Sequence, residues 1–157
     1  MGKLIHIVAS ICFLISLGAC QTIPLSEQNT IHPDHQWNSS KPEKYQFKIT
    51  DTSHLYKVIF VIRHHNAYRY KNIWVELTHQ ITGQRPIIQQ FNLPLADDQK
   101  GWLGTGMDDI FDQRIPLTQQ PIKLKYGINT FIIKHTMRED PLQSILSTGI
   151  RIEKVTL

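Results

Sequence analysis

Apolar residues occur in two patterns along this chain: one continuous run at the start, and short alternating segments from Tyr45 onward. The segment Tyr45-Gln46-Phe47-Lys48-Ile49 has an apolar side chain at every second position, which is the period of a half-buried β-strand. Turn residues separate this segment from further β-rich runs. The expected strands are residues 45–49, 55–63, 72–78, 86–93, 107–117, 122–124, 127–135 and 147–157.

The segment 58–62 is continuously apolar, so its strand is expected to be central in a sheet or buried on both faces. Helical spacing is found only in residues 137–146, where Pro141 limits it to a single turn. Strands that follow one another without helices between them are typical of antiparallel sandwiches. We therefore expect an all-β, antiparallel β-sandwich, with jelly-roll and immunoglobulin-like topologies both open.

The apolar run at the start extends from Leu4 to Leu17 behind Lys3 and ends in Gly18-Ala19-Cys20. It contains 14 residues, whereas a membrane-spanning helix needs about 20. A basic residue, a short apolar region and small residues before a cysteine are typical of a lipoprotein signal peptide; a plain secretory signal is the alternative. We predict that residues 1–19 are cleaved and that Cys20 is lipidated.

The segment that follows the cysteine is polar, rich in Gln, Ser, Asn and Pro, and lacks apolar periodicity. We interpret residues 20–44 as the lipidated cysteine and a tether, and residues 45–157 as the β-sandwich domain. Trp37 is an apolar exception, and we expect it to dock on the domain or to belong to a partner surface. In the tether, His32, Asp34 and His35 are read as solvated residues in preference to metal ligands.

Charge and cysteine content narrow the function classes. The formal net charge is +4, and loss of Lys3 with the signal peptide lowers it to +3. Basic residues are scattered among acidic ones, so nucleic acid is excluded as a partner. Cys12 leaves with the signal and Cys20 is acylated, so we expect no disulfide and a domain stabilised by its core.

Recognisable catalytic motifs are absent from the sequence: it has no Gly-Xaa-Ser-Xaa-Gly elbow, no phosphate-binding glycine loop and no His-Glu-Xaa-Xaa-His. Carboxylates do gather in and after a glycine-rich loop, where they are either calcium ligands or, as we prefer, turn formers. Trp102 in that loop either stacks on a ligand or, as we prefer, plugs the end of the sandwich. We expect a non-enzyme without cofactor or metal. The carboxylates are Asp97, Asp98, Asp108, Asp109 and Asp112.

Several of these segments, in their order and spacing behind the signal peptide, resemble the gliding-motility lipoprotein family GldH of the Bacteroidetes. The segments are Asp51-Thr52, residues 68–74, Leu95-Ala96-Asp97, residues 101–110, Met137-Arg138 and residues 149–154. The resemblance implies a non-enzymatic, palmitate-bearing lipoprotein of the outer membrane, at its periplasmic face. It also implies association with the gliding apparatus and the type IX secretion machinery.

Together, the residue pattern and the resemblance predict a lipid-tethered domain that docks other envelope proteins, with Trp102, Asp108 and Asp109 as the docking residues. The alternative is a carbohydrate-binding envelope lipoprotein. For that function, Tyr68, Tyr70, Trp74 and Trp102 would have to form an exposed aromatic platform, so the exposure of these rings distinguishes the two hypotheses.

Overall fold

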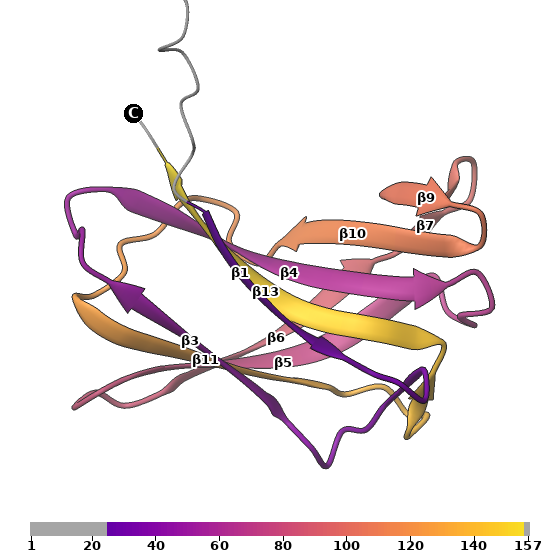
Figure 1. The fold of residues 1–157 in the computed structure, drawn as a ribbon, viewed down its shortest axis with the longest axis horizontal. Coiled ribbons are helices and arrows are strands. Elements are labelled where there is room, and N and C mark those ends of the chain that lie inside the picture. Colours follow the sequence, from indigo (N-terminus) through magenta and orange to yellow (C-terminus); the bar gives the residue numbers. More distant parts are fainter. Residues whose placement is uncertain (1–24, 156–157) are drawn as a thin grey trace, which may run out of the picture.

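The computed structural model describes residues 25–155, which form two antiparallel sheets packed face to face (Figure 1). The predicted signal peptide and Cys20 lie outside the described residues. The five-stranded sheet has the order β1 (Leu25–Ile31), β13 (Ile145–Val155), β4 (Leu55–His65), β10 (Ile110–Pro116) and β9 (Thr105–Met107). The four-stranded sheet has the order β3 (Glu43–Ile49), β11 (Gly127–His135), β5 (Asn72–Ile81) and β6 (Ile87–Pro94). Two short pairs join β2 (Gln36–Trp37) to β12 (Leu142–Gln143), and β7 (Ala96–Asp97) to β8 (Gly101–Trp102).

The all-β fold expected from the sequence is confirmed, and the strand order decides its topology. Strands β1-β13-β4-β10 lie opposite β3-β11-β5-β6, which is the double Greek key of a jelly roll. Residues 25–155 contain no helix, and so none that could cross a membrane. The single helical turn allowed for residues 137–146 is therefore wrong; that segment turns at the cis peptide Asp140-Pro141 and continues into β12.

The predicted tether is wrong from Leu25 onward, because the chain enters the sheet there as β1. All seven residues of β1 pair with β13, from Leu25 opposite Glu153 to Ile31 opposite Ser147. Because β1 is an edge strand with mostly exposed side chains, it needs no alternation of apolar residues. The expected docking of Trp37 is confirmed, since its ring is 1% exposed in the core.

Strand β4 confirms the expectation from its continuous apolar run. It lies between β13 and β10, with Phe60 and Ile62 fully buried in the core. On the other face, Ile59 and Val61 are 6% and 5% exposed. The apolar run therefore marks a central strand buried on both faces.

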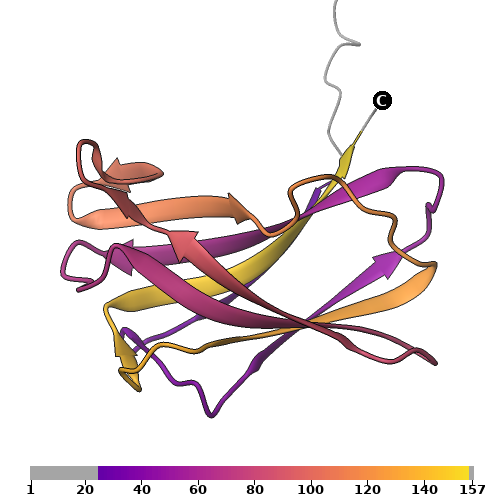
Figure 2. The same cartoon turned by 180° about the vertical axis from the view of Figure 1, so that it is seen from behind.

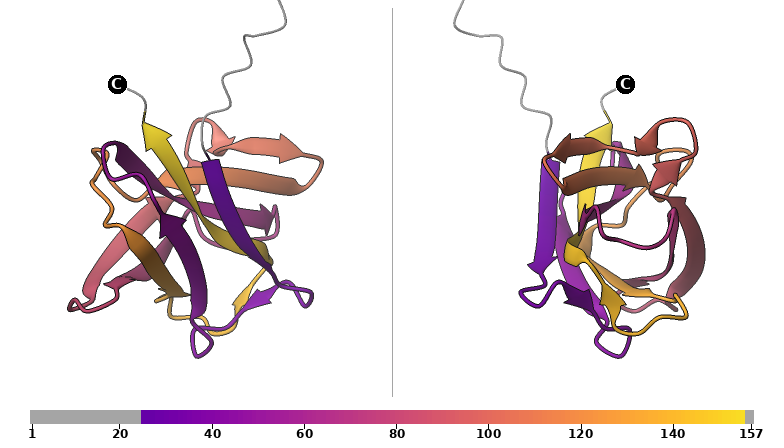
Figure 3. Two further views of the ribbon diagram at one scale, coloured as in Figure 1. Left: turned by 60° about the vertical axis from the view of Figure 1, so that its left-hand side comes forward. Right: turned by 90° about the vertical axis from the view of Figure 1, so that its right-hand side faces the viewer.

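The connections between strands gather at two opposite ends of the sandwich (Figure 1, Figure 2). At one, here called the terminal end, segments 50–54, 82–86 and 117–126 lie with Leu25 and Val155. Figure 3 shows β1 beginning and β13 ending side by side there, as their pairing requires. The other, the loop end, contains segments 32–42, 66–71, 95–109 and 136–144. The predicted docking residues all lie at the loop end.

Candidate functional site

Strands β9 and β10 form a tight hairpin at the loop end, with Met107 opposite Ile110 and Asp108-Asp109 as its turn. Asp108 has a φ of 55°, a left-handed conformation that aspartate tolerates better than most residues. Before the hairpin, Gly104 has a φ of +88°, and a Cβ atom there would lie 2.3 Å from the carbonyl oxygen of Asp112. The hairpin therefore packs against its own entering segment. Met107 is 77% exposed at its tip.

Trp102 lies behind this hairpin and is half-buried against the core. Its ring centroid is 4.6 Å from that of His64 and 5.9 Å from that of Phe111. The expectation that Trp102 plugs the end of the sandwich is confirmed. Its part in the predicted docking site is thus to support the hairpin from behind.

His64 is fully buried beneath Trp102. The Gln113 amide nitrogen donates to the backbone oxygen of Leu95 at 2.8 Å and lies 3.3 Å from Nε2 of His64. Burial lowers the pKa of His64 below its ordinary value. The ring is therefore neutral at pH 7. The neighbouring His65 faces outward, because adjacent residues of a strand point to opposite faces.

The loop carboxylates have separate partners. Asp109 pairs with His65, Asp98 pairs with Lys71, and Asp112 accepts two bonds of 2.8 Å from Arg63. The Asp97 carboxylate accepts hydrogen bonds from the backbone N–H groups of Gln99 and Lys100, as is typical of an aspartate that forms a turn. Within residues 25–155, no cluster of three His, Cys, Asp or Glu residues could hold a metal ion. The arrangement supports the turn-former interpretation.

A groove of about 320 Å³ runs along the hairpin, and we call it the hairpin groove. Asp108 and Asp109 line it, as does Met107, whereas Trp102 does not. Met107 was not among the docking residues predicted from the sequence, in which nothing distinguishes an exposed methionine from a buried one. The lining residues are Arg63, Thr105, Gly106, Met107, Asp108, Asp109, Ile110 and Asp112.

The four rings of the sugar-binding alternative do not form one platform. Tyr68 is 4% exposed, and Tyr70 is half-buried with its hydroxyl donating to Glu139 at 2.7 Å. Both lie in the connection before β5, whereas Trp74 lies within β5. Trp74 is 42% exposed and lines a groove of about 540 Å³ with Tyr70. Tyr68, Tyr70 and Trp102 line a second groove, of about 310 Å³, but Trp74 is the only exposed ring of the four.

The expectation that His32 is a solvated tether residue is wrong, because its side chain is 9% exposed in a polar cluster beside the core. Its Nε2 lies 3.1 Å from the Thr148 hydroxyl and 3.1 Å from the Glu43 carboxylate. The Glu43 carboxylate also accepts hydrogen bonds from the hydroxyl groups of Tyr45 and Thr148, each with an oxygen–oxygen distance of 2.5 Å. The histidine thus helps to fasten the segment after β1 onto both sheets.

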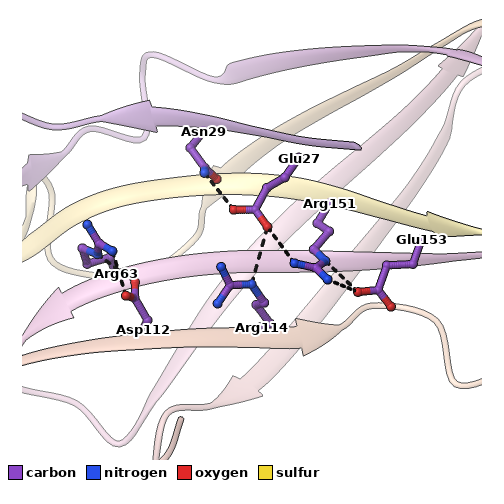
Figure 4. Close-up of polar contacts among 7 residues, drawn as sticks. All are labelled: Glu27, Asn29, Arg63, Asp112, Arg114, Arg151 and Glu153. Atoms are coloured by element: carbon purple, nitrogen blue, oxygen red, sulfur yellow. Dashed lines mark hydrogen bonds and ion pairs between the residues drawn. The ribbon is translucent and has the colours of Figure 1, made fainter. Parts of the chain in front are cut away.

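A network of charges covers the outer face of the five-stranded sheet (Figure 4). The Glu27 carboxylate lies 3.4 Å from Arg151 and 3.5 Å from Arg114. Arg151 also pairs with Glu153 at 2.6 Å. Burial raises the pKa of Glu27, but the bond from Asn29 and the two arginines together lower it below the ordinary value. The network links edge strand β1 to the rest of the sheet, which is a structural role.

The match to known proteins spans the same part of the chain as the two sheets. The family model described as GldH lipoprotein matches residues 25–152, from the first residue of β1 into β13. A curated protein of Christiangramia forsetii, the "Gliding motility lipoprotein GldH homolog", is 22% identical over 127 residues, which cover 76% of this chain and 78% of that protein. The resemblance seen in the sequence is thereby confirmed: the chain belongs to the GldH lipoprotein family, whose members are gliding-motility lipoproteins.

Proposed function

We propose that this protein is a non-enzymatic docking or assembly component of the gliding motility and type IX secretion apparatus. In this proposal Cys20 bears the lipid, palmitate included, and holds the domain at the periplasmic face of the outer membrane. Family membership supports a membrane-associated, lipid-anchored protein. The sequence around Cys20 supports the position of the lipid.

The observation that supports docking is the hairpin groove. Met107 is an exposed, flexible apolar side chain beside Asp108, on a hairpin whose Phe111 packs against Trp102. Methionine adapts to irregular partner surfaces, while a rigid hairpin reduces the entropy lost on binding. These features fit a partner protein that offers an apolar pocket with basic groups at its rim.

The position of the groove also favours docking. It lies at the loop end, at the opposite end of the sandwich from Leu25, where the chain leads back to the proposed anchor. A protein held by its N-terminus thus presents the groove away from the membrane. Other envelope proteins can approach it there.

The test uses a deletion strain complemented with the full gene. Met107→Glu combined with Asp108→Lys should impair surface spreading and secretion of type IX substrates. It should also remove an envelope protein that co-purifies with the wild-type protein from detergent-solubilised membranes. The matched control is Ile88→Glu, which alters another exposed apolar residue, on strand β6. Normal spreading, secretion and co-purification in the double variant would refute the hairpin groove as the docking site.

The anchor is tested separately. Cys20→Ser should move the protein from the membrane fraction to the soluble periplasmic fraction, because the acyl chains supply the hydrophobic binding energy. Persistence of the variant in membranes after high-salt washing would contradict lipidation at Cys20.

A further inference from the structure

The terminal end of the sandwich is basic. Its two acidic residues are both paired, Asp51 with Lys154 and Glu153 with Arg151. Five further basic residues there are exposed, and none forms an ion pair with any residue of the range 25–155. They are Lys48, Lys57, Arg85, Lys123 and Lys125.

Apolar groups are exposed among these charges. Tyr126, next to Lys125, is 72% exposed, and Ile128 is 42% exposed on the strand position beside Lys48. Leu25 is 46% exposed and lines a groove of about 350 Å³ together with Lys48 and Lys154. Lysine, tyrosine and aliphatic side chains in one area suit the interface of a membrane, where apolar parts enter the headgroup layer and charges meet phosphates.

The length of chain before β1 restricts how this end can lie. Cys20 precedes Leu25 by five residues, which reach at most about 17 Å when fully extended. Strand β13 has 11 residues, so the loop end is about 36 Å from the terminal end. A domain attached this closely cannot turn its loop end toward the membrane, because Leu25 would then have to stand farther away than the chain can reach.

The loop end has the opposite character. Its segments contain seven acidic residues and five basic ones, a net charge of −2, so an anionic surface disfavours its approach. The acidic residues are Asp34, Asp97, Asp98, Asp108, Asp109, Glu139 and Asp140, and the basic residues are Lys41, Arg69, Lys71, Lys100 and Arg138. At physiological salt, the attraction between the basic terminal end and an anionic membrane surface acts over about 8 Å. The short connection between Cys20 and Leu25 allows the terminal end to come within this distance of the membrane. The charge distribution and the connection length thus favour the same orientation.

We propose that the terminal end, through Lys48, Lys123, Lys125 and Tyr126, rests on an anionic phospholipid surface and fixes the loop end pointing away from it. The inference depends on the lipid anchor at Cys20 proposed above. The ligand is the phosphate-bearing headgroup layer of the membrane to which the protein is anchored. The orientation would keep the hairpin groove accessible to partners.

The test uses the full lipidated protein in vesicles containing anionic phosphatidylglycerol. With Cys12 lost and Cys20 acylated, a single introduced cysteine can be labelled with a fluorophore. Tyr126→Cys and Met107→Cys form a matched pair, because the two residues are 72% and 77% exposed at opposite ends. Quenching by a headgroup-labelled lipid should be strong at position 126 and weak at position 107. It should decrease in purely zwitterionic vesicles and at about 500 mM salt.

Charge variants then test the named residues. Each lysine near an anionic surface changes the contact equilibrium about fivefold, so Lys123→Gln with Lys125→Gln should lower it about 25-fold. Lys41→Gln with Lys100→Gln, the same charge change at the loop end, should leave quenching at position 126 unchanged.

The outcomes separate the two proposals. If the wild-type protein does not float with the vesicles in high salt, the anchor is refuted, and the orientation with it. Flotation with equal quenching at positions 126 and 107 overturns the orientation alone. Cross-linking of position 126 to an acidic envelope protein, in place of lipid, in native membranes would show that the basic end is a protein interface and would also overturn the proposal.

Discussion

Trp102 and His64 pack with ring centroids 4.6 Å apart and ring planes at 62°, closing the loop end of the sandwich behind the β9–β10 hairpin. The contact joins β8 to the central strand β4. It therefore relates the stability of the domain to the position of the hairpin groove, since the hairpin lies over this pair. Trp102, one of the predicted docking residues, thus supports the outward-facing residues of the hairpin from behind.

Replacing Trp102 by alanine should lower the free energy of unfolding by about 2–3 kcal/mol, somewhat less than the loss for a fully buried tryptophan. Trp74→Ala removes the same side chain from an exposed site and should cost less than about 1 kcal/mol. Urea unfolding followed by circular dichroism measures both. Similar losses in the two variants would contradict the assignment of Trp102 as a plug.

Gly149→Ala should loosen strand β1. A Cβ atom at Gly149 would lie 1.9 Å from Oδ1 of Asn29 and 2.5 Å from the backbone oxygen of Gln28. We expect a loss of about 1–3 kcal/mol and faster amide exchange along β1. Gly101→Ala is the control, because its φ of +73° is unfavourable for alanine but its Cβ has open space. Protection of β1 unchanged by Gly149→Ala would refute the close approach.

Detachment of β1 would also lengthen the connection to the anchor. In Gly149→Ala, lipid quenching at position 126 should therefore fall, since more residues would separate the domain from Cys20. Retention of full quenching with β1 detached would show that the basic end alone sets the orientation.

The Arg63–Asp112 pair should contribute about 0.5 kcal/mol, because both side chains are partly exposed to water. The bonds from Arg63 lower the pKa of Asp112, so this stability is present above the ordinary value of 3.8 and is lost as the pH falls through the folded-state pKa. A double-mutant cycle with Arg63→Met and Asp112→Asn measures the coupling. A coupling free energy of zero at neutral pH and low salt would contradict a stabilising role of the Arg63–Asp112 pair.

Buried and half-buried histidines should make the domain acid-sensitive. Burial lowers the pKa values of His64, His79 and His135 below 6.5, so the unfolded chain binds their protons more readily than the folded chain. The free energy of unfolding is therefore highest when the pH is above the ordinary histidine pKa, and it decreases as the pH falls below that pKa. Unfolding midpoints measured between about pH 7 and pH 5 should decline.

The matched variant for this prediction is His79→Phe. The His79 ring stacks on Phe131 with centroids 4.4 Å apart, so phenylalanine preserves the stacking but does not titrate. The variant loses the contact between Nε2 of His79 and Asn129. Its decline in stability is therefore measured relative to its own stability at pH 7. The decline toward pH 5 should be shallower in the variant, and an equal slope would exclude His79 as a contributor.

Strands with one buried face were predictable because burial imposes a period of two on the sequence. The expected strand at residues 127–135 coincides with β11, and the apolar centre of β4 identified a central strand. Edge strand β1 had no such signal, since its stabilisation comes from backbone pairing with β13 and from charge contacts at Glu27. A polar segment and a polar edge strand are alike in composition, and this is why the tether was predicted too long.

The candidate site, like the fold, was predicted only in part from the sequence. Asp108 and Asp109 were identified from the sequence, and they line the hairpin groove. The inward packing of Trp102 was preferred, but only its contact with His64 decides it. Met107 was missed because a lone methionine in a sequence gives no indication of its exposure.

By itself, the sequence determined the β class, the family, the signal peptide pattern at Cys20 and the segments that form the core, because each depends on local residue order or on the period of burial. Only the tertiary structure decided the jelly-roll topology, the pairing of β1 and the separation of a basic terminal end from the loop end with the hairpin groove. These depend on which distant segments pair: Leu25 is placed by Glu153, 128 residues later. Pairing between such distant residues leaves no periodic trace in the chain.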